Sequence, residues 1–223
     1  MLEAFFDESG THAGAPLLCV DGYFGSHEQW DYFLSQWHIP DFHAKNSSDS
    51  SKYKLAELIN ESGLTGMVCF VNPQRYAEET NAQWKTGIGN AFAACALACV
   101  LGISKELPTT PVAYVLEDGQ PNTEWVHRVI TAMSHDEHWQ QSIASVTLAK
   151  KPNFVQLHTA DFIAHSWSTD HPIWRTVLTN GHVYETDITP TLASMSEQVK
   201  QIDSARRAER RRLKKQQKKE LGY

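Results

Sequence analysis

Acidic residues occur at three places in this sequence from which they could act together on one ion or substrate. Asp7 and Glu8 end a short apolar run near the N-terminus. Glu117 and Asp118 end a second such run, and Asp161 lies inside a third apolar segment. Grouped carboxylates repel one another, and a divalent cation is the usual way in which a protein tolerates such a group. Carboxylate oxygens are also the ligands that Mg²⁺ and Mn²⁺ prefer. The pattern predicts a Mg²⁺ or Mn²⁺ site formed by Asp7, Glu117 and Asp161, suited to phosphoryl transfer.

Each of these acids also has a structural interpretation. Acids after strands commonly serve as turn residues or helix caps, and Asp118-Gly119 is an ordinary turn pair. Taken singly, each acid is more often structural than catalytic. Asp161 differs because an acid embedded in apolar sequence needs a partner if it is buried. Together, the three sites favour a cluster.

The elements that must position these acids alternate along the chain. Strands are predicted over 2–7, 16–25, 64–71, 111–117 and 143–149, and helices over 26–37, around 55–59, over 83–103 and 123–133, and from 156 onwards. This order indicates an α/β domain with a mixed sheet flanked by helices. Without a helical insertion at about residues 26–63, it is the order of the ribonuclease H fold. If the first and fourth strands are neighbours, their ends bring Asp7 and Glu117 close together.

Four short motifs together resemble the family called domain of unknown function 3800. They are FFDESG at 5–10, FHA at 42–44, LED at 116–118 and QLHTADFIA at 156–164, and the resemblance covers about residues 1–170. The first and last motifs are the most specific. The family is grouped with ribonuclease-H-like folds and is thought to include nucleases, so the resemblance implies a metal-dependent nuclease.

The resemblance also implies which residues form the site. Matched residue by residue, it gives Asp7, His43, Glu117 and Asp161 as the catalytic set, with Glu8 and Asp118 as neighbours.

The chain departs from ribonuclease H enzymes in one respect. Those enzymes carry an acid on the first long helix, whereas this helix offers only Thr86 and Asn90 near its start, with Glu78 and Glu79 just upstream. His43 is expected to take the place of that acid, as a metal ligand or as a general acid or base. That substitution puts a strict two-metal arrangement in doubt.

The residues around His43 have ordinary interpretations as well. A histidine beside Phe42 is often simply half-buried. Lys45 could contact a scissile phosphate or could be a solvated lysine.

Charge is distributed unevenly along the chain. The formal net charge is -6, yet residues 203–223 carry nine basic and three acidic residues, a balance of +6, which leaves -12 on the rest. We expect residues 1–190 to form the domain and 191–223 a basic helical tail that tracks a phosphate backbone. The alternative is a solvated helix without a ligand. The tail residues expected to bind nucleic acid are Arg206, Arg207, Arg210, Arg211, Arg212, Lys214, Lys215, Lys218 and Lys219.

Composition sets the class of protein. The 223 residues are 41% hydrophobic and 21% charged, close to an ordinary globular protein. No apolar run is long enough to span a bilayer, and the four cysteines lie in apolar segments, so a reduced cytoplasmic protein is expected.

The sequence therefore predicts divalent-metal-dependent hydrolysis of phosphodiester bonds in nucleic acid. A catalytically silent protein of the same fold that binds nucleic acid or an acidic partner is the alternative. The choice between DNA and RNA, and the oligomeric state, stay open.

Overall fold

The computed structural model describes residues 1–11, 15–80, 84–119, 122–174, 182–191 and 211–212. Within them, six strands form one mixed sheet in the order β5-β4-β1-β2-β3-β6. The strands are β1 (Leu2–Ser9), β2 (Leu18–Ser26), β3 (Thr65–Val71), β4 (Val112–Glu117), β5 (Ile143–Ala149) and β6 (Val183–Asp187). The helices of the same residues are α1 (His27–Gln36), α2 (Asp49–Glu61), α3 (Pro73–Thr80), α4 (Trp84–Glu106), α5 (Thr123–Met133) and α6 (Leu157–Ser168), with short 3-10 turns η1 (Lys151–Asn153) and η2 (Thr189–Thr191).

Strand β1 lies at the centre of the sheet and has one partner of each kind. It pairs antiparallel with β2 and parallel with β4, where Phe6 stands opposite Leu116. The mixed α/β sheet flanked by helices is confirmed, and so is the expectation that the first and fourth predicted strands are neighbours. This pairing aligns the carboxyl ends of β1 and β4.

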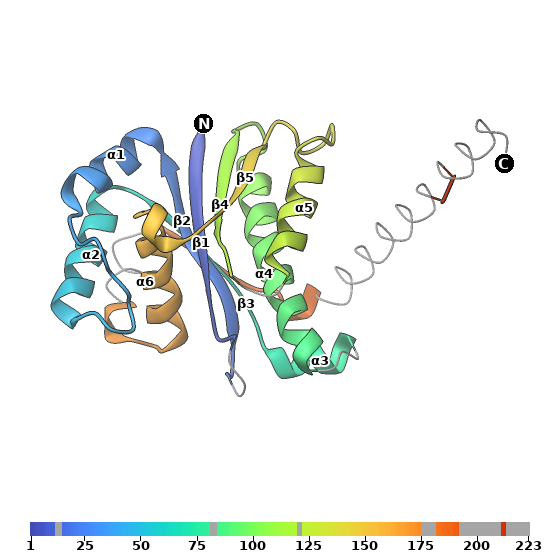
Figure 1. Ribbon diagram of the computed structural model, residues 1–223, viewed down its shortest axis with the longest axis horizontal. Coiled ribbons are helices and arrows are strands. Elements are labelled where there is room, and N and C mark those ends of the chain that lie inside the picture. Colours follow the sequence, from blue (N-terminus) through green and yellow to red (C-terminus); the bar gives the residue numbers. More distant parts are fainter. Residues whose placement is uncertain (12–14, 81–83, 120–121, 175–181, 192–210, 213–223) are drawn as a thin grey trace.

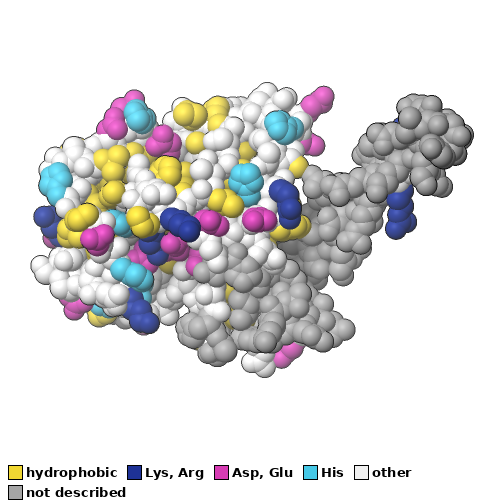
Figure 2. Space-filling model, viewed as in Figure 1, with side chains coloured by type: hydrophobic (Ala, Val, Ile, Leu, Met, Phe, Trp, Pro, Cys, Tyr) yellow, Lys and Arg dark blue, Asp and Glu magenta, His cyan; other side chains and the backbone are white. Residues whose placement is uncertain are grey.

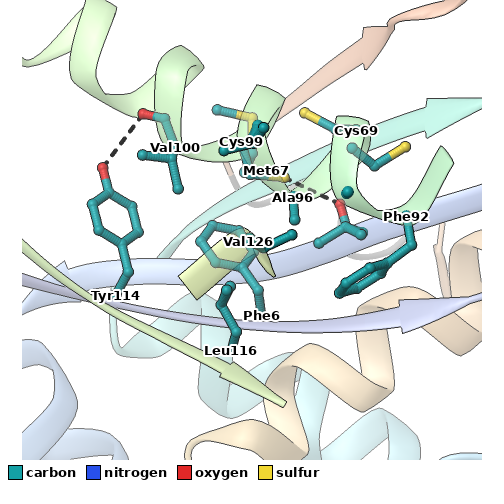
Figure 3. Close-up of a cluster of buried hydrophobic side chains, with 14 of the residues drawn as sticks. Phe6, Met67, Cys69, Phe92, Ala96, Cys99, Val100, Tyr114, Leu116 and Val126 are labelled. Carbon is teal, nitrogen blue, oxygen red and sulfur yellow. Dashed lines mark hydrogen bonds between the residues drawn. The ribbon is translucent and has the colours of Figure 1, made fainter. Parts of the chain in front are cut away.

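Helices cover both faces of the sheet (Figure 1). On one face α4 and α5 enclose an almost wholly apolar cluster that includes Phe6, Tyr114 and Leu116 (Figure 3). On the other face α1, α2 and α6 pack over Phe5 and Val115. Because successive strand residues point to opposite faces, Asp7 follows Phe5 and Glu117 follows Val115 onto the side covered by α6.

Two elements escaped the sequence prediction. Strand β6 extends the sheet edge beside β3 in parallel, but four of its five residues are exposed, so it lacks the alternation that marks a strand. Helix α3 begins at Pro73, which had been taken only as the end of the preceding strand. Proline is well suited to the first helical position, and Asn72 caps the helix by accepting a hydrogen bond from the Arg75 amide at 3.0 Å.

The cysteines and the tail bear on two further expectations. Cys19, Cys69, Cys95 and Cys99 are all free and buried. None of the helices in the described part of the chain has the length and apolarity to cross a membrane. Of the nine basic residues predicted for the tail, only Arg211 and Arg212 are described, and both are helical and exposed. The other tail residues named above lie outside the described residues, namely Arg206, Arg207, Arg210, Lys214, Lys215, Lys218 and Lys219.

Candidate functional site

The ends of β1 and β4 bring the first two acidic positions together. Asp7 is 3% exposed and comes directly after Phe6, the last residue of β1 that pairs with β4. Glu117 occupies the same place after Leu116 on β4. Carboxylate oxygens of Asp7, Glu8 and Glu117 lie within 4.8 Å of one another. Gly10 turns the chain after these acids with a φ of +75°, and a Cβ there would collide with the Leu17 carbonyl oxygen, so the turn requires glycine.

Helix α6 supplies the third position, because it packs across β1 and β2 with Asp161 on its buried side. Asp161 is 6% exposed. Its Oδ2 accepts a hydrogen bond from the Ala44 amide at 2.6 Å. The loop that carries Ala44 is fixed by Phe42, whose ring packs edge-on against Trp37 at 5.5 Å. A buried acid in apolar sequence thus has the partner it needs, and the loop between α1 and α2 is held at the site.

A lysine that the sequence interpretation missed stands between the three acids. The Lys151 Nζ atom lies 2.8 Å from Asp7 Oδ2, 3.1 Å from Glu117 Oε2 and 2.9 Å from Asp161 Oδ1. Lys151 opens η1 immediately after β5, which pairs with β4. The signal was present, since Lys150-Lys151-Pro152 follows a strand whose end lies beside that of β4, but the pair was taken only as a boundary.

His43 and Lys45 approach from the same loop. The His43 Nδ1 atom lies 3.4 Å from Asp161 Oδ2, and the His43 side chain is about half exposed, at 52%. Lys45 is exposed and lines the same pocket. The structure brings both residues to the acids, and their proposed chemical roles stay predictions.

These side chains surround one pocket of about 350 Å³. Its lining contains all seven residues named from the sequence for the domain site, together with residues that the sequence interpretation missed. The lining residues are Asp7, Glu8, Ser9, His43, Lys45, Glu117, Asp118, Gly119, Lys151, Asp161, Ala164 and His165. On the face shown in Figure 2, acidic, basic and histidine side chains lie interspersed and do not form patches of one sign.

Burial and mutual repulsion alter the acidities in the pocket. Burial, followed by the negative charges of Asp7 and Glu117, raises the pKa of Glu8 to about 9. Burial and the interaction with Asp7 raise the pKa of Glu117 to about 8, although Lys151 opposes the shift. Burial lowers the pKa of Lys151, but the charges of Asp7 and Asp161 outweigh it, so its pKa lies above the usual range. The site therefore holds more negative charge than one lysine balances, and it retains protons near neutral pH.

The acid expected on the first long helix has no counterpart among the described side chains. Helix α4 packs on the opposite face of the sheet from Asp161 (Figure 1). Glu78 is exposed and accepts a hydrogen bond from Gln74 at 3.1 Å. The side chains of Glu79, Thr86 and Asn90 lie outside the described residues.

The donor set suits a hard divalent cation. Several carboxylates converge, and an ammonium group already marks a position that favours positive charge. Residues Asp7, Glu8, Glu117 and Asp161 are those that could hold such an ion.

Comparisons with known proteins concern the fold. No family model matches the chain, and no curated protein matches it in sequence. Among solved structures, ribonuclease H2 from Pyrococcus horikoshii OT3 is 14% identical, with a TM-score of 0.52 over 77% of this chain and 74% of that chain. A structure of Bst-RNase HIII in complex with Mn²⁺ is 15% identical, with a TM-score of 0.50 over 77% of this chain and 53% of that chain. This chain thus spans about half the length of that ribonuclease HIII.

Both matches cover 77% of this chain, at identities that show a common fold alone. That fold agrees with the order of elements predicted from the sequence, so the chain has a ribonuclease-H-like fold.

Proposed function

We propose that this protein is a divalent-metal-dependent nuclease that hydrolyses phosphodiester bonds in nucleic acid. The observation that carries the proposal is the convergence of Asp7, Glu117 and Asp161, from β1, β4 and α6, within 3.1 Å of one cationic nitrogen. A group of buried acids that needs a cation is what metal-assisted phosphoryl transfer requires. The fold shared with ribonuclease H2 and with the Mn²⁺ complex of RNase HIII supports the same proposal.

The four motifs that resemble the domain of unknown function 3800 family support the proposal from the sequence side. Each motif contributes at least one side chain to the same pocket, namely Asp7, His43, Glu117 and Asp161. Membership in that family is part of what we propose.

Asp7, Glu8 and Glu117 would hold Mg²⁺ or Mn²⁺, because their carboxylate oxygens lie within 4.8 Å of one another, and Asp161 would lie beside the ion. When bound, such an ion supplies Lewis-acid activation of a phosphate oxygen and of the attacking water. The protein's own part is to group the acids on rigid strand ends and to keep the pocket polar.

The cationic and basic side chains of the pocket have complementary roles. Lys45 would bind a non-bridging phosphate oxygen, because it is exposed and lines the pocket. The Asp161 carboxylate holds the Nδ1 side of His43, which leaves Nε2 as the ring nitrogen for taking or giving a proton at the scissile phosphate.

One observation favours the silent binding protein as a second candidate. The Lys151 ammonium already fills the space between three of the acids. In such a protein the lysine would neutralise the acids and no metal would bind.

A cleavage assay separates the two candidates. Full-length protein is incubated with labelled single- and double-stranded DNA, RNA and an RNA–DNA hybrid, in Mn²⁺, Mg²⁺ or EDTA. We expect metal-dependent cleavage of at least one substrate by the wild type. Asp7→Asn should abolish it because it removes a buried charge from the centre of the site. Asp31→Asn, the same change at an exposed position on α1, is the matched control and should cleave normally.

Two results contradict the proposal. Cleavage by Asp7→Asn at the wild-type rate would assign the activity to another site or to a contaminant. Binding without cleavage under every condition would favour the silent binding protein.

The tail is proposed to supply affinity, since the rest of the chain carries a formal charge of -12 and repels a polyanion. On duplex DNA each neutralised phosphate contributes about 0.9 to the slope of log affinity against log salt. A chain truncated after residue 202 should show a flatter slope and weaker binding at low salt, yet still cleave at high substrate concentration. Identical slopes would remove the tail from nucleic-acid binding.

A further inference from the structure

We infer that Lys151 is a permanent cation of the site: its ammonium fills the position between Asp7, Glu117 and Asp161, and one divalent ion binds beside it, at Asp7, Glu8 and Glu117. The protein would then bind one ion where the acids alone would hold two. The part that concerns the ion rests on the proposed function. The part that concerns the lysine does not.

The first step is the geometry of the ammonium group. A lysine ammonium has three N–H donors and no acceptor. Lys151 has three carboxylate oxygens within 3.1 Å of Nζ, one from each of three acids on three different elements. Each donor therefore has an ionised or ionisable partner, and moving the lysine away would break three charge-assisted hydrogen bonds at once.

The second step is the anchoring of the lysine backbone. The strand that precedes η1 is paired with the site, since β5 ends at Ala149, which stands opposite Glu117 in the β4–β5 register. The η1 turn closes with a hydrogen bond from the Phe154 amide to the Lys151 carbonyl at 3.1 Å. The Phe154 ring packs against the Phe5 ring, with centroids 6.2 Å apart. Phe5 lies two residues before Asp7 on β1 and on the same face of the sheet. The lysine is thus fixed to the same strands as the acids.

The third step concerns Asp161, which is not one of the three acids whose oxygens all lie within 4.8 Å of one another. Asp161 uses Oδ1 for Lys151, and its Oδ2 accepts from the Ala44 amide at 2.6 Å with His43 Nδ1 at 3.4 Å. A divalent ion bound at Asp7, Glu8 and Glu117 would leave these contacts of Asp161 intact. Asp161 is better described as a positioning residue that holds Lys151 and His43.

The fourth step places the ion. Glu8 completes the group of acids, because its carboxylate oxygen lies within 4.8 Å of oxygens on both Asp7 and Glu117. With all four acids ionised, the site carries four negative charges, and one lysine and one divalent ion offset three of them. Lys151 would then supply the positive charge that a second ion provides in a two-metal site.

The decisive measurement is the number of Mn²⁺ ions bound. Full-length wild type and Lys151→Gln are titrated with Mn²⁺ in the absence of substrate, by calorimetry and by loss of the free-ion electron paramagnetic resonance signal. Lys150→Gln is the matched control, because Lys150 is the exposed neighbour. We expect one Mn²⁺ per chain in wild type and Lys150→Gln, and two in Lys151→Gln.

Two stoichiometries overturn the inference. Two ions in the wild type would mean that the lysine leaves its position when metal binds. One ion of unchanged affinity in Lys151→Gln would mean that the lysine does not fill an ion position.

A second measurement needs no variant. Acetylation of wild-type lysines is followed by mass spectrometry, with and without Mn²⁺. Lys151 should react much more slowly than Lys150 in both conditions, because its ammonium stays hydrogen-bonded. If Lys151 reacted as fast as Lys150 without metal, its assigned position would be wrong. If Lys151 reacted fast only when Mn²⁺ was present, the lysine would leave its position on metal binding and would not be a permanent cation of the site. A protected Lys151 in a protein that binds no Mn²⁺ would instead contradict the metal-dependent function and the neighbouring ion, and it would leave the position of the lysine intact.

Discussion

The two faces of the sheet are built from the same strands, but they differ in chemistry. The face under α4 and α5 is a continuous apolar cluster in which few polar atoms are buried (Figure 3). The face under α1, α2 and α6 buries the acids Asp7, Asp21 and Asp161 and the imidazole of His158 beside its apolar residues. The face under α4 and α5 therefore stabilises the fold through apolar packing. The face under α1, α2 and α6 buries ionisable side chains, which lowers the free energy of unfolding.

Asp21 is the acid on this face that is most completely buried. It pairs with Asp7 across β1 and β2 and is 0% exposed. Burial raises the pKa of its carboxyl well above the usual range, although the interaction with the Cys19 side chain opposes the shift. An acidic site face is tolerable because the opposite face is packed as an ordinary core.

The largest effect on stability is expected from Phe6, which is next to Asp7 in sequence and on the opposite face. Phe6 is 1% exposed and its ring stacks on Tyr114 at 6.5 Å. Phe6→Ala should lower the free energy of unfolding by about 3–5 kcal/mol, through lost burial and a new cavity. Denaturant unfolding measures it, with Asp7→Asn as the comparison variant. If Asp7→Asn destabilised the protein as much as Phe6→Ala, the division between a stabilising face and a chemical face would be wrong.

The site shows which information the sequence carries locally. Asp7 and Glu117 could be grouped because both end apolar strands, and parallel neighbours align such ends. Asp161 could be suspected because an acid among apolar helix residues needs a partner. These arguments use only local patterns and one assumed strand pairing, and the structure has that pairing.

Other parts depend on contacts that no local pattern contains. Lys151 joins the acids because η1 turns the chain back after β5, and a lysine before a proline looks like any loop residue. Strand β6 forms because it pairs with β3, although four of its five residues are exposed. Tertiary structure decides both, so sequence periodicity could not reveal them.

A pH dependence of stability tests the cost of the acidic face. Glu117 has a pKa raised to about 8 in the folded protein, so the folded state binds a proton that the unfolded state has already lost. This protonation stabilises the fold fully below the unfolded pKa, and the stabilisation is lost as the pH rises through the folded value. The free energy of unfolding of metal-free protein should therefore fall from about pH 5 to about pH 9. Glu8, with a pKa raised to about 9, acts in the same direction.

The variant Glu117→Gln isolates this contribution, since glutamine does not titrate. Its stability relative to wild type should rise steadily across that interval when both are unfolded in EDTA. Glu57→Gln removes an exposed acid on α2 and should show a constant difference from wild type. Parallel curves for Glu117→Gln and wild type would mean that Glu117 does not retain its proton in the folded state.

The smallest effect is expected from a polar group on the apolar face. The Tyr114 hydroxyl donates to the Val100 carbonyl oxygen at 3.4 Å and lies 3.4 Å from the Ser104 hydroxyl (Figure 3). Both contacts are long. The Val100 carbonyl also lies inside α4, where the helix supplies a backbone donor. Tyr114→Phe should therefore lower the free energy of unfolding by only about 1 kcal/mol. Metal-dependent cleavage should be unchanged, because the hydroxyl is on the side of the sheet away from the pocket. A variant that unfolds like wild type but cleaves poorly would show that the apolar face takes part in function, and the comparison between the two faces would fail.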